Sequence, residues 1–255
     1  MPQKFCLFCG EPPNDKTREH VLPRWLIALT GDESRTATFG FDLSADVDEP
    51  KPRRFAFSQF HFPACKACNN RFGALERLAK PIVVKLLERM SLTPREASTL
   101  LDWLDKVRVG LWLGIHQLDK NVEGIRPRFY VEHRVARKDR MLLLGYSLET
   151  QKHLSFAGPT LLAFRWLPSA FSLVVNNLFL VNISSDFLLA RRLGFPYPQA
   201  PGQSLGRYMP DYIALRPGLG RVLRPIFRGA LQFDGIAFHQ PIFPLGEYPQ
   251  CRPLY

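Results

Sequence analysis

The sequence predicts an α+β protein in three parts, and three observations support this. Two identical Cys-x-x-Cys pairs lie near the two ends of the first part, at Cys6–Cys9 and Cys65–Cys68. Apolar residues at spacings of three or four follow from Asn70 to about His116, which is typical of helices. From Pro127 onward, turn residues separate apolar runs of strand length. The expected parts are residues 1–80, a helical segment 81–120, and a basic β-rich domain 121–255 of unknown type.

The two cysteine pairs predict a structural zinc ion. Gly10 follows the first pair directly and permits the tight turn in which backbone amides approach thiolates. Two such turns supply four soft ligands for tetrahedral Zn²⁺, namely Cys6, Cys9, Cys65 and Cys68. The alternatives are unrelated buried thiols or a redox Cys-x-x-Cys, although no βαβ pattern surrounds either pair. Cys251 is expected to be an ordinary free thiol.

The helical part contains two helices. The first carries Phe72, Leu75, Leu78, Ile82 and Leu86, with Pro81 inside it. The second opens at Thr93-Pro94-Arg95-Glu96, which has the spacing of a capping box, and continues to about His116. Strands are expected at 55–57, 60–62, 128–134, 141–147, 160–166, 171–175, 179–183 and 236–243, and a short helix at 185–193.

The charge of the chain favours a polyanionic partner. Lysine and arginine number 34 against 23 acids, which gives a net charge of +11. An acidic lipid surface could use the same charge, so basicity alone does not choose the partner. The most apolar stretch, from Thr160 to Ile183, is interrupted by Arg165 and Pro168 and predicts buried strands instead of a membrane span. Without an apolar leader, we expect a cytoplasmic protein that binds nucleic acid and no membrane; the oligomeric state is not predicted.

Between the cysteine pairs, Glu19-His20-Val21-Leu22-Pro23 forms a compact chemical unit. Adjacent side chains on a strand point to opposite faces, so a carboxylate can bind a metal while the imidazole faces a substrate. Neutral imidazole accepts a proton from water near pH 7. A divalent cation beside it would stabilise charge on a phosphate.

Taken together, Cys-x-x-Cys, Glu19-His20-Val21-Leu22-Pro23 and Cys65-x-x-Cys68-Asn69-Asn70 resemble the HNH endonuclease superfamily in its four-cysteine form. The continuation through Ala74-Leu75-Glu76 resembles a set of bacterial HNH-containing proteins. The resemblance covers residues 5–78. It implies a zinc-stabilised ββα-metal module, in which a β-hairpin and a helix hold one catalytic metal.

The resemblance also implies roles for single residues. His20 takes the place of the general base, and Glu19 and Asn69 take the places of the catalytic metal ligands. Asn70 assists or caps the following helix. An amide ligand suits Mg²⁺ or Mn²⁺ better than Zn²⁺. Arginines are expected to hold the nucleic acid, and those near the motifs are Arg18, Arg24 and Arg71.

Two residues depart from the pattern of the family. Many relatives have an asparagine that orients the base where this chain has Phe60. His61 beside it either supplies the missing contact or is a strand residue with no role. Asn69 stands where histidine is common. The expected function is a metal-dependent endonuclease that cleaves nucleic acid, with DNA as the expected substrate. The alternative is a non-catalytic zinc-stabilised module that only binds DNA or RNA.

Overall fold

The computed structural model describes residues 5–13, 15–31, 33–43, 50–120, 124–132, 139–147, 152–185, 221–223 and 236–241. The described helices are α1 (Arg24–Thr30), α2 (Lys66–Leu87), α3 (Pro94–Leu118) and α4 (Pro127–Glu132), with 3₁₀ turns η1 (Phe57–Gln59) and η2 (Leu162–Arg165). The described strands are β1 (Lys16–His20), β2 (Thr36–Asp42), β3 (Lys51–Ala56), β4 (His61–Cys65), β5 (Asp139–Tyr146), β6 (Leu154–Ala157), β7 (Ala170–Val175), β8 (Leu178–Ser185), β9 (Arg221–Leu223) and β10 (Ile236–Pro241).

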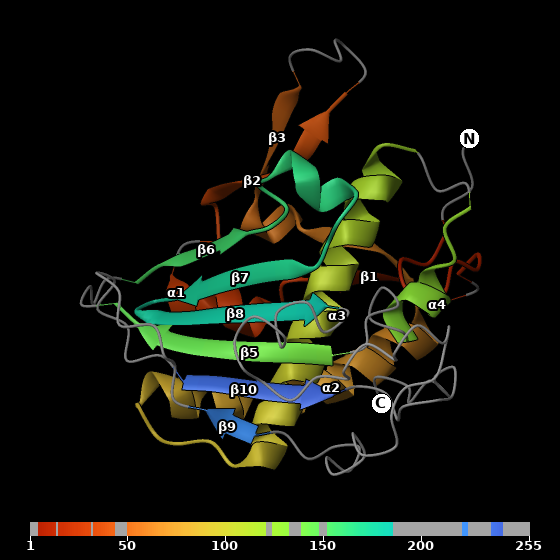
Figure 1. The fold of residues 1–255 in the computed structure, drawn as a ribbon. Helices are drawn as coiled ribbons and strands as arrows, with labels where there is room; N and C mark the ends of the chain where they lie inside the picture. Colours follow the sequence, from red (N-terminus) through yellow and green to blue (C-terminus); the bar gives the residue numbers. More distant parts are fainter. Residues whose placement is uncertain are drawn as a thin grey trace, which may run out of the picture.

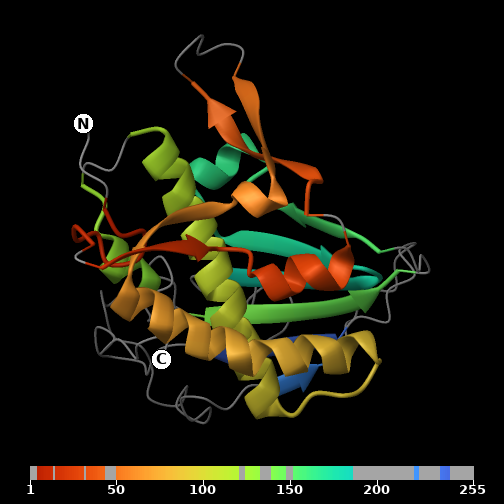
Figure 2. The ribbon, with the colours of Figure 1, turned by 180° about the vertical axis from the view of Figure 1, so that it is seen from behind.

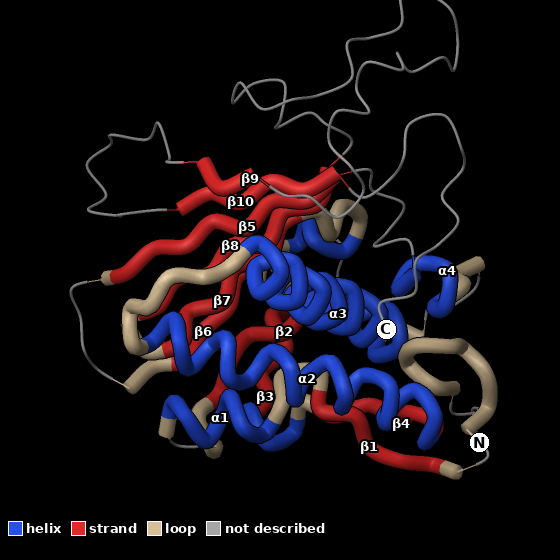
Figure 3. Tube along the Cα trace, turned by 90° about the horizontal axis from the view of Figure 1, so that it is seen from below, coloured by secondary structure: helices blue, strands red, loops and turns tan. Residues whose placement is uncertain are grey.

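These elements form three layers, and α3 is the middle one (Figure 1). One layer is an antiparallel sheet in the order β6-β7-β8-β5-β10-β9. Behind it lies α3, and behind α3 lie α1, α2 and the β1–β4 pair (Figure 2). The view from below shows α3 between the sheet and α2 (Figure 3). The α+β prediction is therefore confirmed at the level of fold class.

The strand pair that carries Glu19-His20 is antiparallel, and its register places Glu19 opposite Phe62 and His20 opposite His61. Helix α2 begins directly after β4, so strand, strand and helix form one compact unit. The intervening residues form the β2–β3 hairpin, which projects from the molecule (Figure 1). This hairpin is a second strand pair, separate from β1 and β4.

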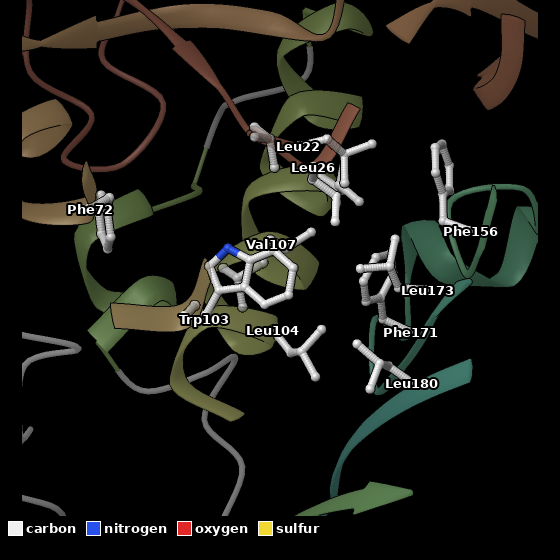
Figure 4. Packing of buried hydrophobic residues seen from close by; sticks show 14 of the residues in the cluster. Leu22, Leu26, Phe72, Trp103, Leu104, Val107, Phe156, Phe171, Leu173 and Leu180 are labelled. Carbon is white, nitrogen blue, oxygen red and sulfur yellow. The ribbon is translucent and has the colours of Figure 1, made fainter. Parts of the chain in front are cut away.

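Helix α3 is buried on every side. All residues from Leu100 to Ile115 are buried, which is the pattern of a helix enclosed by other elements. Figure 4 shows Trp103, Leu104 and Val107 of α3 between side chains of the sheet and those of the N-terminal part. The labelled neighbours are Leu22, Leu26, Phe72, Phe156, Phe171, Leu173 and Leu180, and all belong to one continuous hydrophobic core.

Charged side chains interrupt this buried helix at Asp102, Asp105, Lys106 and Arg108. The carboxylate of Asp105 accepts hydrogen bonds from Arg108 at 3.0 Å, Arg140 at 2.8 Å and Asn182 at 2.9 Å. Arg140 comes from β5 and Asn182 from β8, so the network joins the helix to the sheet. A buried charge is tolerated when it is paired and hydrogen-bonded in this way.

Strand β4 of the N-terminal part lies close to α3 at Gly114. A Cβ placed on Gly114 would lie 2.5 Å from Cζ of Phe62 on β4. We expect Gly114→Ala to lower the free energy of unfolding by about 1–3 kcal/mol through overpacking, which exceeds the roughly 1 kcal/mol that alanine gains in helix propensity. Denaturant unfolding measures the change.

Gly73→Ala is the matched control, because its Cβ would meet only Nη1 of Arg77 at 3.9 Å. This substitution lies in α2 and should stabilise the protein by up to about 1 kcal/mol. Equal effects of the two substitutions would show that the close packing at Gly114 carries no energetic cost.

Several expected elements are confirmed. The capping box at Thr93 and Glu96 is present, and α2 continues through Pro81. Strands occur within 141–147, 171–175, 179–183 and 236–243. The 55–57 strand ends at Ala56 within β3, and the 60–62 strand is β4, which begins at His61. The expected helix at 185–193 lies almost wholly outside the described residues.

Two expected strands are wrong. Residues 127–132 form α4, because Pro127 is at the first helical position and its fixed φ suits a helix start. Residues 162–165 form η2, in which only Phe164 is buried while Leu161 and Trp166 are exposed. The apolar composition of these runs did not distinguish a strand from a helical turn.

The predicted division at residue 80 falls inside α2, which runs from Lys66 to Leu87. The hydrophobic core is continuous from the first cysteine pair to β8. The three-part division stays a prediction. Among the described helices, none has the length and hydropathy to cross a membrane.

Candidate functional site

The four predicted zinc ligands lie together. The ligand atoms of Cys6, Cys9, Cys65 and Cys68 are all within 4.8 Å of one another, and the Cys9 and Cys65 sulfurs are 3.9 Å apart. Tetrahedral zinc with bonds of about 2.3 Å requires sulfur separations of about 3.8 Å. The four cysteines are therefore positioned to bind a metal ion, consistent with structural zinc.

Local backbone geometry explains how each pair reaches the cluster. Gly10 has a φ of 79°, and its amide donates to the carbonyl of Cys6 at 2.9 Å, which closes the predicted tight turn. Cys65 is the N-cap of α2, and its sulfur accepts from the amide of Cys68 at 3.4 Å. A helix N-terminus favours thiolate, because its free amides and dipole stabilise negative charge.

The thiols of this cluster affect one another's protonation. The hydrogen bond with Cys68 is the main reason that the pKa of Cys6 falls to about 4. Burial raises the pKa of Cys9 to about 11, and the hydrogen bond with Cys6 raises the pKa of Cys68. Four thiolates at this spacing repel each other, so a cation that replaces their protons would stabilise the cluster.

Where β1 ends and β4 begins, two histidines lie next to each other. The rings of His20 and His61 are 5.5 Å apart between centroids and meet edge to face. Both side chains are partly buried, so both retain access to solvent. Glu19, next to His20 on β1, and Phe62, next to His61 on β4, point to the opposite face, toward α3. The predicted separation of Glu19 and His20 onto opposite faces is observed.

The environment of His20 keeps its ring neutral. Burial, and next the charge of Arg24, lower the pKa of His20 to about 4, with His61 acting in the same direction. The backbone of Ser58 acts in the opposite direction on the pKa of His20. At neutral pH, the ring of His20 is therefore unprotonated at one nitrogen, which can accept a proton.

Phe60, at the position where many HNH proteins have asparagine, is packed in the hydrophobic core. Phe60 is 2% exposed and contacts the rings of Phe39, Phe57 and Phe156. It cannot orient the histidine. The backbone of Ser58, two residues earlier in η1, raises the pKa of His20. The side-chain types in the sequence did not point to this backbone group.

Glu19 is engaged by a lysine that sequence reasoning did not single out. Lys106 of α3 places its Nζ 2.6 Å from Oε1 of Glu19 and 2.8 Å from Oε1 of Glu76 on α2. Lys106 was detectable as a basic residue within the apolar helical run, and Glu76 as the last residue of the quoted motif. Their separation in sequence hid the contact.

Asn69 and Asn70 occupy the first turns of α2. The amide nitrogen of Asn69 donates to the hydroxyl of Thr17 on β1 at 3.0 Å, and that hydroxyl donates to the carbonyl of Ala64 on β4. Asn69 therefore ties the helix to the strand pair. The expectation that Asn70 caps α2 is wrong, because the helix begins at Lys66 and Asn70 is an exposed residue inside it.

In this structure, Glu19 and Asn69 each bond to a protein partner. Glu19 and Asn69 contact different partners, and among the described residues only the four cysteines group three or more metal-binding side chains. Mg²⁺ and Mn²⁺ require several oxygen ligands. As they stand, Glu19 and Asn69 do not fit such an ion, and their assignment as its ligands stays a prediction.

The three candidate arginines divide between two faces. Arg18 and Arg24 are exposed, Arg18 shares the strand face of His20, and Arg24 lies close enough to affect its pKa. Arg71 belongs to α2, which packs against the face of Thr17, and its guanidinium lies over the ring of Phe72. The structure therefore groups Arg18, Arg24, His20 and His61 and leaves Arg71 apart.

Comparisons with known proteins add no assignment, since no family model, no curated protein and no solved structure matches the chain.

Proposed function

We propose that this protein is a zinc-stabilised nuclease of the HNH type, which hydrolyses nucleic-acid phosphodiester bonds with His20 as the general base. DNA is the first substrate to test. The observation that carries the proposal is the arrangement at His20, whose neutral ring is partly exposed and lies beside the ring of His61. The strand–strand–helix unit anchored by four cysteines supports it.

In this proposal, phosphate binds over the face of β1 and β4. The exposed guanidiniums of Arg18 and Arg24 bind its non-bridging oxygens. The free nitrogen of His20 takes a proton from water as the oxygen of that water bonds to phosphorus. The phosphorus–oxygen bond to the leaving nucleotide breaks, and the leaving oxygen takes a proton from solvent. His61 contacts the edge of His20 and helps to fix its ring.

The resemblance adds a catalytic Mg²⁺ or Mn²⁺ to this scheme. Such an ion would supply charge stabilisation at the phosphate. Because Glu19 and Asn69 do not fit it as they stand, the steps above involve only the side chains of the His20 face.

The test is a cleavage assay on plasmid DNA and single-stranded RNA, with no added divalent ion and with Mg²⁺ or Mn²⁺. We expect His20→Ala to reduce the rate by about 10²–10⁴-fold, the usual contribution of a general base. His153→Ala is the matched control, since this histidine is exposed at the start of β6. Zinc content is measured in each protein, so that lost activity is not confused with lost fold.

A wild-type rate in His20→Ala would contradict the role of His20. No cleavage by the wild type under any of these conditions would contradict nuclease activity itself.

A second candidate is a zinc-stabilised module that binds DNA or RNA without cleaving it. The ion pair between Glu19 and Lys106 favours it, because that pairing gives Glu19 a structural role. Binding of DNA or RNA in a gel-shift assay, without cleavage and with equal affinity in His20→Ala, would support this candidate over the nuclease.

A further inference from the structure

A closed cation site lies between β1, α2 and α3. The ammonium of Lys106 lies 2.6 Å from Glu19 and 2.8 Å from Glu76. The side chain of Lys106 is 0% exposed, that of Glu19 is 5% exposed and that of Glu76 is 18% exposed. Two carboxylates from different elements thus converge on one cation, and only the Glu76 side approaches solvent.

Two aromatic rings complete the surroundings of this cation. Nζ of Lys106 lies 5.5 Å from the ring centroid of Phe8 and 5.9 Å from that of Phe72. The two rings pack against each other with centroids 4.3 Å apart. Ring faces attract cations, and the attraction strengthens away from water. Phe8 stands between Cys6 and Cys9, so the first cysteine turn also contributes to the site.

We infer that Lys106 is the resident cation of this site, occupying the position in which Glu19 and Glu76 would otherwise hold a divalent metal ion. The protein then takes up no exchangeable metal at Glu19. Insofar as the nuclease proposal holds, its reaction proceeds without an ion at that carboxylate. The chain itself supplies the positive charge that the strand–helix contact requires.

The charges around Lys106 support this inference. Carboxylates this close together and largely buried are costly without a cation between them. Burial raises the pKa of Glu19, and the neighbouring charge of Lys106 opposes that rise. Burial opposes the charge of Lys106, but the attraction of Glu19 and Glu76 outweighs it and raises the pKa of the lysine. A free metal ion would have to displace a cation that is covalently tethered to α3. Without the ammonium, the same two carboxylates would attract a hard divalent ion such as Mn²⁺.

The test is Mn²⁺ binding to the zinc-loaded full chain, followed by electron paramagnetic resonance. We expect the wild type and Glu19→Gln to bind Mn²⁺ equally weakly. We expect Lys106→Ala to gain one bound Mn²⁺ per chain, and Lys106→Ala combined with Glu76→Gln to lose it. Lys85→Ala is the matched control, because Lys85 pairs with Glu96 at 2.8 Å in a partly exposed position and its removal should create no site.

Two outcomes would overturn the inference. One is tight Mn²⁺ binding by the wild type that Glu19→Gln abolishes. The other is a Lys106→Ala protein that keeps its zinc and its circular dichroism yet gains no Mn²⁺. If Lys106→Ala does not fold, the comparison of wild type with Glu19→Gln decides. Cleavage is scored separately, so an inactive wild type would contradict the nuclease proposal and leave the Mn²⁺ result standing.

Discussion

Loss of the metal at the four cysteines is expected to unfold the N-terminal part of the protein. Cys68→Ser removes one ligand from the first turn of α2 and leaves three thiols that must share or lose their protons. Structural zinc contributes about 10–16 kcal/mol of apparent binding free energy in small zinc domains. That exceeds or equals the whole stability of most domains, about 5–15 kcal/mol.

The damage should extend beyond the cysteines. Phe8 lies within the first cysteine turn, and its ring packs on Phe72 and faces the ammonium of Lys106. Release of this turn removes one wall of the site that holds Glu19. The expected result is zinc-free protein with a lower thermal midpoint and reduced helical circular dichroism.

Metal analysis and thermal unfolding, with and without a chelator, measure these effects. Cys251→Ser is the control, because Cys251 is the remaining cysteine of the chain and is not one of the four. If the purified wild type contains no metal and melts at the same temperature with or without chelator, the structural role of zinc is refuted.

The second large effect is expected at Asp105. This carboxylate is 0% exposed and pairs with Arg108 and Arg140, and it accepts a third hydrogen bond from Asn182. Asp105→Ala leaves two guanidiniums buried with fewer partners. Breaking a buried pair by removing one partner typically costs about 3–5 kcal/mol. Denaturant unfolding of the zinc-loaded protein should show a loss of this size.

Asp42→Ala provides the comparison. Asp42 pairs with Arg53 at 3.5 Å and its side chain is 44% exposed, so its removal should cost about 1 kcal/mol or less. If both substitutions cost the same, the buried network does not stabilise the contact between α3 and the sheet.

Local signals in the sequence predicted the elements that depend on local chemistry. The two Cys-x-x-Cys pairs predicted the four-cysteine cluster because each pair forms its own turn. The capping box predicted the start of α3 because its partners are three residues apart. Alternation along β1 also predicted that Glu19 and His20 face opposite ways.

The rest depended on contacts between distant parts of the chain. Lys106 is 87 residues from Glu19, and no local sequence pattern around either residue predicts their contact. Arg140 is 35 residues or more from Asp102 and Asp105, yet its guanidinium is buried against both carboxylates. In both cases, the decisive partner comes from α3, whose central position is a property of the whole fold.

The burial of α3 from Leu100 to Ile115 has a consequence for dividing the molecule into fragments. A fragment ending at residue 80 would contain the four cysteines, His20 and Glu76, but it would lack Lys106 and the surface at Gly114 on which Phe62 rests. Its two facing carboxylates would have no counterion, and an apolar wall would be open to water. The segment that carries the motifs is therefore not expected to be stable by itself. It depends on α3, which follows it in the sequence.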